Sequence, residues 1–206
     1  MDKCIIITAY IEGKIKNIID TDNSYIICAD GGYAKAVAED ITPSVLIGDF
    51  DSYNGTLPEN IEIIKFPAHK DDTDTYLAIS HAMQKGYSDI TVVGGLGGRV
   101  DHTIANIQNI VSCLRKGLRI KIADEQNKIF ALENDEIVIP EERGKKISVF
   151  AHGGTARGVS ISGTEYTLKN FDLHPDFPIG VSNEFIEKEA VIKVENGVLL
   201  IVLTSD

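Results

Sequence analysis

The sequence has no tryptophan and only three cysteines among its 206 residues. Cys4, Cys28 and Cys113 stand far apart, so they form neither a disulfide framework nor the closely spaced pairs that bind zinc. We therefore predict reduced, buried thiols. Cys28 lies near the motifs described below and is an alternative candidate for a nucleophile, but no lysine or histidine follows it locally to activate it, which favours a core role.

Basic residues are also in short supply. The chain has 20 lysines and arginines against 31 acidic residues, a formal net charge of −11. Nucleic-acid backbones are bound chiefly through Lys and Arg, so this balance argues against a broad nucleic-acid surface. A polyanionic ligand would have to be held locally, through cations.

Long apolar runs are missing as well. The apolar run near the N-terminus is too short for a secretory signal, and no stretch approaches the ~20 residues that span a bilayer. We therefore predict a cytoplasmic protein with no membrane partner. The 43% apolar and 25% charged content is ordinary for a globular chain of one large or two modest domains.

The first part of the chain, residues 1–124, alternates short β-branched runs with helix-like stretches. Continuously apolar strands of this kind are typical of a mostly parallel sheet covered on both faces, so we predict an α/β domain. Two helices are predicted, Asp74–Lys85 and Asp101–Lys116, each stopped by a glycine. The predicted strands are Cys4–Thr8, Tyr25–Ala29, Val45–Ile47, Ile61–Phe66, Ile90–Val93 and Arg119–Ala123. The predicted buried stripe of the second helix is Ile104, Ile107, Val111 and Leu114.

The second part, residues 125–206, has a different pattern. No long amphipathic helix is evident there. Short alternating segments are separated by Gly, Asn, Pro and Asp, among them Lys146–Ala151, Val159–Ser162, Glu189–Val194 and Val198–Leu203. We predict an all-β antiparallel sandwich or partial barrel. The turn Glu195–Gly197 between two apolar runs predicts a hairpin.

Two acids, Asp49 and Asp51, directly follow the apolar run Val45–Ile47. Alternate residues of an extended chain point the same way, so both carboxylates can converge on one hard cation such as Mg²⁺. An exposed turn is the alternative interpretation, since turns are rich in aspartate. A second acid cluster is formed by Asp71, Asp72 and Asp74. Thr73 or Asp72 is predicted to cap the helix that begins near Asp74, and the N-terminus of that helix could also accommodate metal-bound phosphate, so both interpretations can hold together.

A glycine-rich segment, Gly94–Gly98, lies between a predicted strand and a predicted helix. Its backbone N–H groups could approach phosphate oxygens closely. It is no Walker A loop, because no Gly-Lys-Ser/Thr follows, and Val100 stands where the dinucleotide fingerprint needs its third glycine. Arg99 supplies donors suited to phosphate, and Asp101 could complete a metal shell. His102 could orient the site, but its spacing from other histidines does not suit zinc.

Five motifs stand out along the chain. They are Ala29–Gly32, Ile47–Ser52, Asp71–Asp74, Gly94–His102 and Gly180–Phe185. In this order and approximate spacing the chain resembles the thiamine pyrophosphokinases over nearly its whole length. The resemblance implies an α/β catalytic domain that binds nucleotide and metal, followed by a β-sandwich that contributes to thiamine binding and dimerisation. It also implies Mg²⁺-dependent transfer of diphosphate from ATP to the hydroxyl of thiamine, with release of AMP, by a homodimer whose active sites lie between subunits.

The resemblance also assigns residues. The implied metal ligands are Asp49, Asp51, Asp74 and Asp101. The implied catalytic residues are these four together with Asp71 and Arg99. The implied ATP contacts are Asp30, Gly31, Gly95, Gly97, Gly98, Arg99 and His102. The implied thiamine contacts are Ser182, Asn183 and Phe185. Some family members place a tryptophan against thiamine, and since this chain has none, Phe185 or Tyr166 is the candidate stacking residue.

Two other functions use the same features. A metal-dependent nucleotidyltransferase would employ these acids and the glycine segment but attack the α-phosphorus and release pyrophosphate. A non-catalytic nucleotide- or thiamine-binding module would keep the fold without turnover. The products formed from ATP distinguish the three hypotheses.

Overall fold

The computed structural model describes residues 3–50, 53, 55–66 and 72–206. The chain divides into two compact units, Met1–Glu125 and Gln126–Asp206, each with its own core. An α/β part is followed by a part built of antiparallel strands, as the sequence predicts. The sandwich packing of the second part and the roles assigned to the two parts stay predictions.

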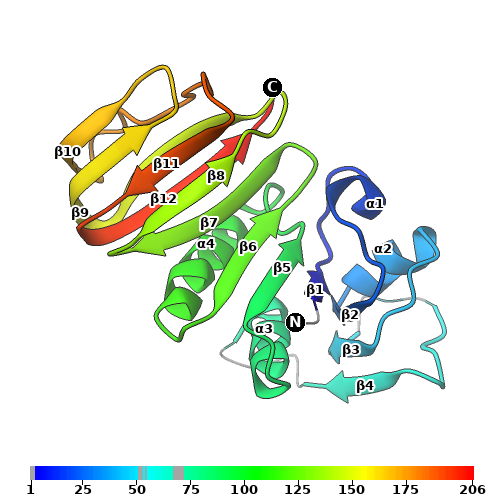
Figure 1. Ribbon diagram of the computed structural model, residues 1–206. Coiled ribbons are helices and arrows are strands. Elements are labelled where there is room, and N and C mark those ends of the chain that lie inside the picture. The colour runs from blue at the N-terminus through cyan, green and yellow to red at the C-terminus, as the bar shows by residue number, and fades with distance from the viewer. Residues whose placement is uncertain (1–2, 51–52, 54, 67–71) are drawn as a thin grey trace. The chain divides into compact units, whose positions relative to one another are not determined.

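The first unit alternates strands with helices (Figure 1). Its elements are β1 (Lys3–Ile7), α1 (Ile15–Ile18), β2 (Ser24–Ala29), α2 (Gly32–Ala38), β3 (Val45–Gly48), β4 (Glu62–Lys65), α3 (Asp74–Gln84), β5 (Asp89–Val93), α4 (Val100–Leu114) and β6 (Arg119–Ala123). The predicted strands and the two predicted helices are present, with ends that differ by at most two residues. The short helices α1 and α2 were not predicted, because they span only four and seven residues.

All the strand pairs described in this unit are parallel, in the spatial order β4-β3-β2-β1-β5-β6. The chain therefore builds the sheet outward from β1 to β4, then returns to the other side of β1 and continues with β5 and β6. Adjacent crossovers on opposite sides leave a crevice at the carboxyl ends of β1 and β5, where parallel α/β sheets bind ligands.

Both faces of this sheet are buried. Side chains of a strand alternate, so Ile5 and Ile7 point to one face, where they pack with Ile15 of α1 and Ala36 of α2. Ile6 is fully buried and points to the other face. Helix α3 contacts strands β1, β2 and β3. No helix in the described parts of the chain is long and apolar enough to cross a membrane.

The buried side of α4 agrees with the predicted stripe only in part, because Val111 is buried and Ile107 and Leu114 are half-buried, whereas Ile104 is exposed. Ile104 is 52% exposed, whereas Asn106 is only 5% exposed and lies on the buried side with Ile110, Val111 and Cys113. The prediction assigned the helix face from its apolar residues alone. A buried asparagine shifted the true face, and its hydrogen bond is described below.

The second unit contains six strands. They are β7 (Asn127–Glu133), β8 (Glu136–Pro140), β9 (Lys146–Ser162), β10 (Leu168–Leu173), β11 (Glu189–Lys193) and β12 (Asn196–Thr204). The 17-residue strand β9 belongs to two ladders. Its first part pairs with β12, which in turn pairs with β7, and its later part pairs with β10 and β11. Apolar residues from both ladders form one core cluster.

The hairpin predicted at Glu195–Gly197 is wrong. Strand β11 pairs with β8 and β9, whereas β12 pairs with β7 and β9. The turn instead carries the chain from one ladder to the other. Gly197 makes this passage possible, because its φ is 116° and a Cβ there would lie 3.0 Å from the Cα of Ala156.

Candidate functional site

A pocket of about 350 Å³ lies at the carboxyl edge of the parallel sheet in the first unit. This volume falls in the range of small-molecule sites. Its walls come from the loops after β1, β2 and β5, from the start of α3 and from α4, which is the crevice that the strand order predicts. The lining residues are Thr8, Ala9, Tyr10, Ala29, Asp30, Thr73, Asp74, Thr75, Gly95, Gly97, Arg99, His102 and Asn106.

Many of the residues implied for ATP and metal meet at this pocket. Those that line it are Asp30, Asp74, Gly95, Gly97, Arg99 and His102. Gly31, Gly98 and Asp101 belong to the same loops and helix starts, and Asp49 follows β3, but none of these four is among the lining residues. Asp51 and Asp71 lie outside the described residues. The individual roles of all these residues stay predictions.

The glycine segment Gly94–Gly98 forms a turn with a left-handed backbone. Its four glycines have φ values of 80°, 77°, 78° and 62°. A side chain is strained in this conformation, and at Gly94 it would also clash, since a Cβ would lie 2.2 Å from the carbonyl oxygen of Tyr10. The turn therefore requires glycine for its shape.

Two buried polar side chains hydrogen-bond the main chain of this turn and of the strand end that leads into it. The Nδ2 of Asn106 donates a hydrogen bond to the carbonyl oxygen of Gly95 at 2.9 Å. The Oγ1 of Thr8 donates to the carbonyl oxygen of Val93 at 3.0 Å. Neither residue was identified from the sequence, although a polar residue on the buried face of α4 is a recognisable signal, because buried polar groups are nearly always hydrogen-bonded.

Arg99 and Asp101 form a two-pronged ion pair at the start of α4. The Nε and Nη2 of Arg99 lie 3.1 and 2.6 Å from the two carboxylate oxygens of Asp101. The backbone N–H of His102 donates to the same carboxylate at 2.9 Å. The hydrogen bond from Arg99, helped by the one from His102, lowers the pKa of Asp101 to about 2. Asp101 is thus a carboxylate at neutral pH, and both its oxygens are engaged by Arg99.

The acids after β2 and β3 come from neighbouring strand ends. The backbone N–H of Asp30 donates to the carbonyl oxygen of Ile47 at 2.8 Å, and Asp30 has a φ of 44°. A Cβ on Gly48 would lie 3.0 Å from the Cα of Asp30, so the two backbones touch where the strands end. Asp49 follows Gly48 directly and is delivered to the same edge of the sheet.

Asp74 is the first residue of α3 and lines the pocket. Thr73 caps the helix, since its Oγ1 accepts a hydrogen bond from the backbone N–H of Tyr76 at 3.2 Å. The N-terminus of this 11-residue helix brings partial positive charge to the pocket wall. The predicted cap at Thr73 is confirmed.

The donor chemistry of the pocket suits Mg²⁺. Asp30 and Asp74 bring carboxylates, which are the hard oxygen ligands that Mg²⁺ prefers, and no cysteine lines the pocket within the described residues. Among those same residues, no group of three or more His, Cys, Asp or Glu side chains gathers closely enough to form a metal cluster. The predicted ligand Asp51 and the predicted catalytic residue Asp71 lie outside the described residues, so the Mg²⁺ site stays a prediction.

The residues implied for thiamine lie in the second unit. Asn183 is 7% exposed, and its Nδ2 donates to the Oγ1 of Thr164 at 3.0 Å and to the carbonyl oxygen of Tyr166 at 2.7 Å. Its Oδ1 accepts from the backbone N–H of Tyr166 at 3.0 Å. Ser182 is exposed, and Phe185 packs partly against the core. Asn183 therefore fixes the position of Tyr166, the alternative stacking residue.

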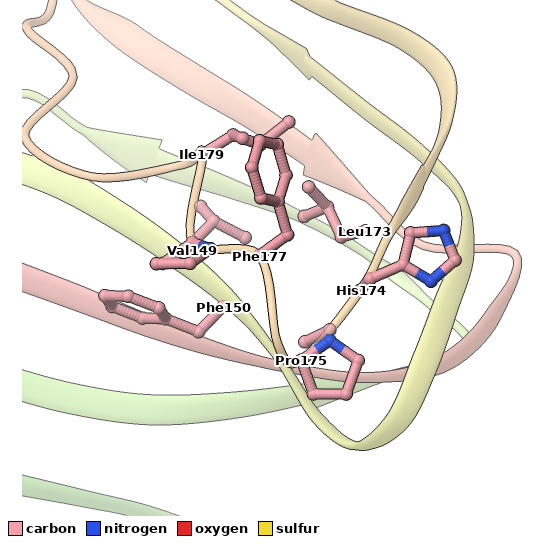
Figure 2. A pocket seen from close by; sticks show the side chains of 9 residues that line it. Val149, Phe150, Leu173, His174, Pro175, Phe177 and Ile179 are labelled. Carbon is pink, nitrogen blue, oxygen red and sulfur yellow. The ribbon is translucent and has the colours of Figure 1, made fainter.

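The cavities described in this second unit are small. Tyr166, Asn183 and residues 179–181 line one of about 50 Å³. Another of about 20 Å³ has mainly apolar walls from β9 and from the segment after β10, with the His174 ring to one side (Figure 2). Neither volume would hold a molecule much larger than a few waters.

The cysteines contribute no reactive group. Cys4, Cys28 and Cys113 are free and buried, as predicted. Burial raises the pKa of Cys28 to about 12. The thiol stays protonated at neutral pH, so the nucleophile hypothesis for Cys28 is not supported.

Known proteins match both units. The family described as thiamin pyrophosphokinase, catalytic domain, matches residues 17–122, and the one described as thiamin pyrophosphokinase, vitamin B1 binding domain, matches residues 135–199. The thiamine pyrophosphokinase of Bacillus subtilis (strain 168) is 27% identical over an alignment 208 residues long, gaps included, which covers 95% of this chain and 97% of that protein.

Solved structures show the same fold. The crystal structure of thiamine pyrophosphokinase from Bacillus subtilis has a TM-score of 0.87 at 24% identity and covers 100% of both chains. A thiamin pyrophosphokinase family protein from Enterococcus faecalis has a TM-score of 0.83 at 26% identity, again over 100% of both chains. With both units matched, the chain belongs to the thiamin pyrophosphokinase family.

Proposed function

We propose that this chain is a Mg²⁺-dependent thiamine diphosphokinase, which transfers diphosphate from ATP to the hydroxyl of thiamine and releases thiamine diphosphate and AMP. Family membership across both units supports the activity and the two substrates. The pocket that unites Asp30, Asp74, Arg99 and the glycine turn is the observation that carries the site assignment.

The pocket supplies the groups that diphosphate transfer needs. The thiamine oxygen attacks the β-phosphorus of ATP, the bond from that phosphorus to the AMP oxygen breaks, and the hydroxyl proton passes to a base. In the proposal the glycine turn and the N-terminus of α3 receive phosphate oxygens. Mg²⁺, held by the predicted ligands Asp49, Asp51 and Asp74 with Asp30 of the pocket beside them, would neutralise phosphate charge.

Arg99 has to exchange partners for this role. Its guanidinium donates both described hydrogen bonds to Asp101. We propose that phosphate oxygens take over this fork, since Arg binds carboxylate and phosphate in the same two-pronged geometry. The exchange frees the oxygens of Asp101 for the metal or for the hydroxyl proton. Asp71, which the resemblance implies as a catalytic residue, is the other candidate for accepting this proton.

The products formed from ATP are the deciding measurement. Purified protein is incubated with ATP, Mg²⁺ and thiamine, and the phosphates are followed by ³¹P NMR while nucleotides are separated by chromatography. We expect AMP and thiamine diphosphate in equal amounts, and none of either when EDTA replaces Mg²⁺. Release of pyrophosphate with a nucleotide-modified acceptor would identify a nucleotidyltransferase. Binding of both ligands without any turnover would identify a binding module.

The thiamine side and the assembly belong to the same proposal. We propose that Ser182, Asn183 and Phe185 serve thiamine and that the chain forms a homodimer with active sites between subunits, as the resemblance implies. Light scattering gives the mass. Mixing Asp74→Asn with Phe185→Ala protein restores activity if one site draws on both subunits, and leaves two inactive variants if it does not. The predicted cytoplasmic location stays a prediction.

A further inference from the structure

Tyr10, the third residue after β1, contacts nearly the whole glycine turn. Its carbonyl oxygen accepts a hydrogen bond from the backbone N–H of Gly95 at 2.8 Å. The same oxygen would lie 2.2 Å from a Cβ on Gly94, which leaves no room for a side chain there. The main chain of Tyr10 therefore fixes the first half of the turn.

The ring of Tyr10 covers the second half. A Cβ on Gly97 would lie 3.1 Å from its Cε1, and a Cβ on Gly98 would lie 3.0 Å from its Cδ2 and Cε2. These distances reach three ring carbons, so the ring lies against the backbone of both glycines. The absence of side chains at Gly97 and Gly98 thus serves two purposes: a left-handed backbone and close contact with an aromatic ring.

The opposite side of the turn is held by α4. Asn106 bonds the carbonyl oxygen of Gly95, and the Oγ1 of Thr103 donates to the carbonyl oxygen of Gly97 at 3.3 Å. The turn therefore contacts Tyr10 on one side and α4 on the other. Tyr10 is also 43% exposed and lines the pocket, so its ring is both a support for the turn and part of the wall that a ligand meets.

We infer that Tyr10 is a positioning residue for the nucleotide, because its ring holds the glycine turn in the conformation that receives the phosphate chain. This inference rests on the proposed function. A turn fixed before binding loses little conformational freedom when the phosphates arrive, and that saving appears as affinity. The ring carbons lie closer to the glycines than the hydroxyl does: a Cβ on Gly97 would lie 3.1 Å from Cε1 and 3.5 Å from the hydroxyl oxygen, and the three nearest atoms to a Cβ on Gly98 are ring carbons. Phenylalanine should therefore replace Tyr10, and an aliphatic residue should not.

Steady-state kinetics of Tyr10→Leu and Tyr10→Phe test the inference. In Tyr10→Leu we expect the KM for ATP to rise about tenfold, which corresponds to the loss of about 1.4 kcal/mol of binding, while the KM for thiamine changes little. In Tyr10→Phe we expect the KM for ATP to stay within about twofold of wild type. An unchanged KM for ATP in Tyr10→Leu, or an equal rise in both variants, would overturn the inference.

Tyr87→Leu is the matched control. Tyr87 stacks on Tyr25 at a ring distance of 5.1 Å, near the amino end of β2, whereas the pocket lies at the carboxyl end of that strand. We expect this variant to lower the melting temperature while leaving the KM for ATP unchanged. A rise in KM for ATP equal to that of Tyr10→Leu would show that lost stability alone explains the effect, and the inference would fail.

A double-mutant cycle shows whether Tyr10 acts through the turn. Gly98→Ala places a methyl group against the ring, so its effect on the KM for ATP should be larger with Tyr10 present than in the Tyr10→Leu background. Equal effects in both backgrounds would contradict the inference. If the wild-type protein itself forms no AMP from ATP and thiamine, the proposed function fails first, and this outcome is distinct from wild-type turnover with an unaffected Tyr10→Leu.

Discussion

The two units use polar groups in opposite ways. In the first unit, parallel strands all end at one edge, and the loops there leave a pocket of about 350 Å³ lined by charged and polar residues. In the second unit, the cavities described have volumes of about 50 and 20 Å³. The buried side chain of Asn183 makes its hydrogen bonds to Thr164 and Tyr166 of the same unit. A parallel sheet gathers its loops at one place, whereas antiparallel strands distribute theirs and fill the space between.

The largest expected effect comes from a charge in the open pocket. Asp74→Asn keeps a good helix-start residue but removes a predicted metal ligand, so we expect kcat to fall by about 10²-fold or more with little change in stability. Asp89→Asn is the control, because Asp89 is exposed at the amino end of β5 and pairs with Arg119 at 3.8 Å. Assays at saturating ATP and thiamine compare the two. An equal loss of kcat in both variants would show that the acids of the pocket are no more important for the reaction than a surface acid.

Asn106 connects stability with the site. Asn106→Ala leaves the carbonyl oxygen of Gly95 without its buried donor, so we expect the free energy of unfolding to fall by about 1–3 kcal/mol and the KM for ATP to rise. Gln108→Ala on the exposed side of α4 should change neither quantity. Denaturant titrations and kinetics of both proteins give the answer. A destabilised Asn106→Ala protein with a normal KM for ATP would mean that the turn keeps its shape without this bond.

Asn183 tests the role of a buried polar side chain in the second unit. Asn183→Ala leaves the peptide N–H of Tyr166 without its acceptor and leaves the C=O of Tyr166 with the Thr164 hydroxyl as its remaining donor, so we expect the free energy of unfolding to fall by about 1–3 kcal/mol. Affinity for ATP should not change. Asn196→Ala, at an exposed position of the same unit, should be neutral. Calorimetry measures both effects. An Asn183→Ala protein as stable as wild type would show that water replaces these bonds.

The smallest expected effect is a pH dependence away from the pocket. Burial lowers the pKa of His81 from 6.5, with a further contribution from Lys85, while Glu62 acts in the opposite direction. The folded protein then favours neutral His81, whose ring nitrogen Nε2 lies 3.2 Å from the Tyr25 hydroxyl. The His81 contribution to stability is complete above pH 6.5 and is lost as the pH falls through the folded-state pKa. In denaturant titrations from pH 7.5 to 5, His81→Phe should show a weaker decline than wild type.

Sequence reasoning located the strands of the first unit and six residues of the pocket, because apolar runs that end in Gly and Asp are strong local signals. It missed Tyr10 and Asn106, since nothing in their neighbours reveals that both contact the glycine turn. The predicted stripe of α4 was wrong at Ile104 for the same reason, since an apolar residue was expected to be buried there and is exposed. Contacts between distant segments are a property of the fold.

The second unit was harder to predict. Strand β9 was expected as separate pieces, Lys146–Ala151 and Val159–Ser162, because the glycines between them resemble a turn. The backbone instead continues through Gly153 and Gly158 with positive φ values of 71° and 66° and stays in one strand. The hairpin predicted at Glu195–Gly197 was wrong for a different reason: the residues of a turn do not determine which strands pair with each other.

That continuous strand has a consequence for how the second unit comes apart. With one part of β9 bonded to β12 and the other to β10 and β11, neither ladder can release it without exposing the apolar core that both share. Amide hydrogens of β7 and β8, at the far ends of the two ladders, should therefore exchange with solvent through a common opening event. We therefore expect the unit to open as a single cooperative element, because one segment of main chain is common to both of its halves.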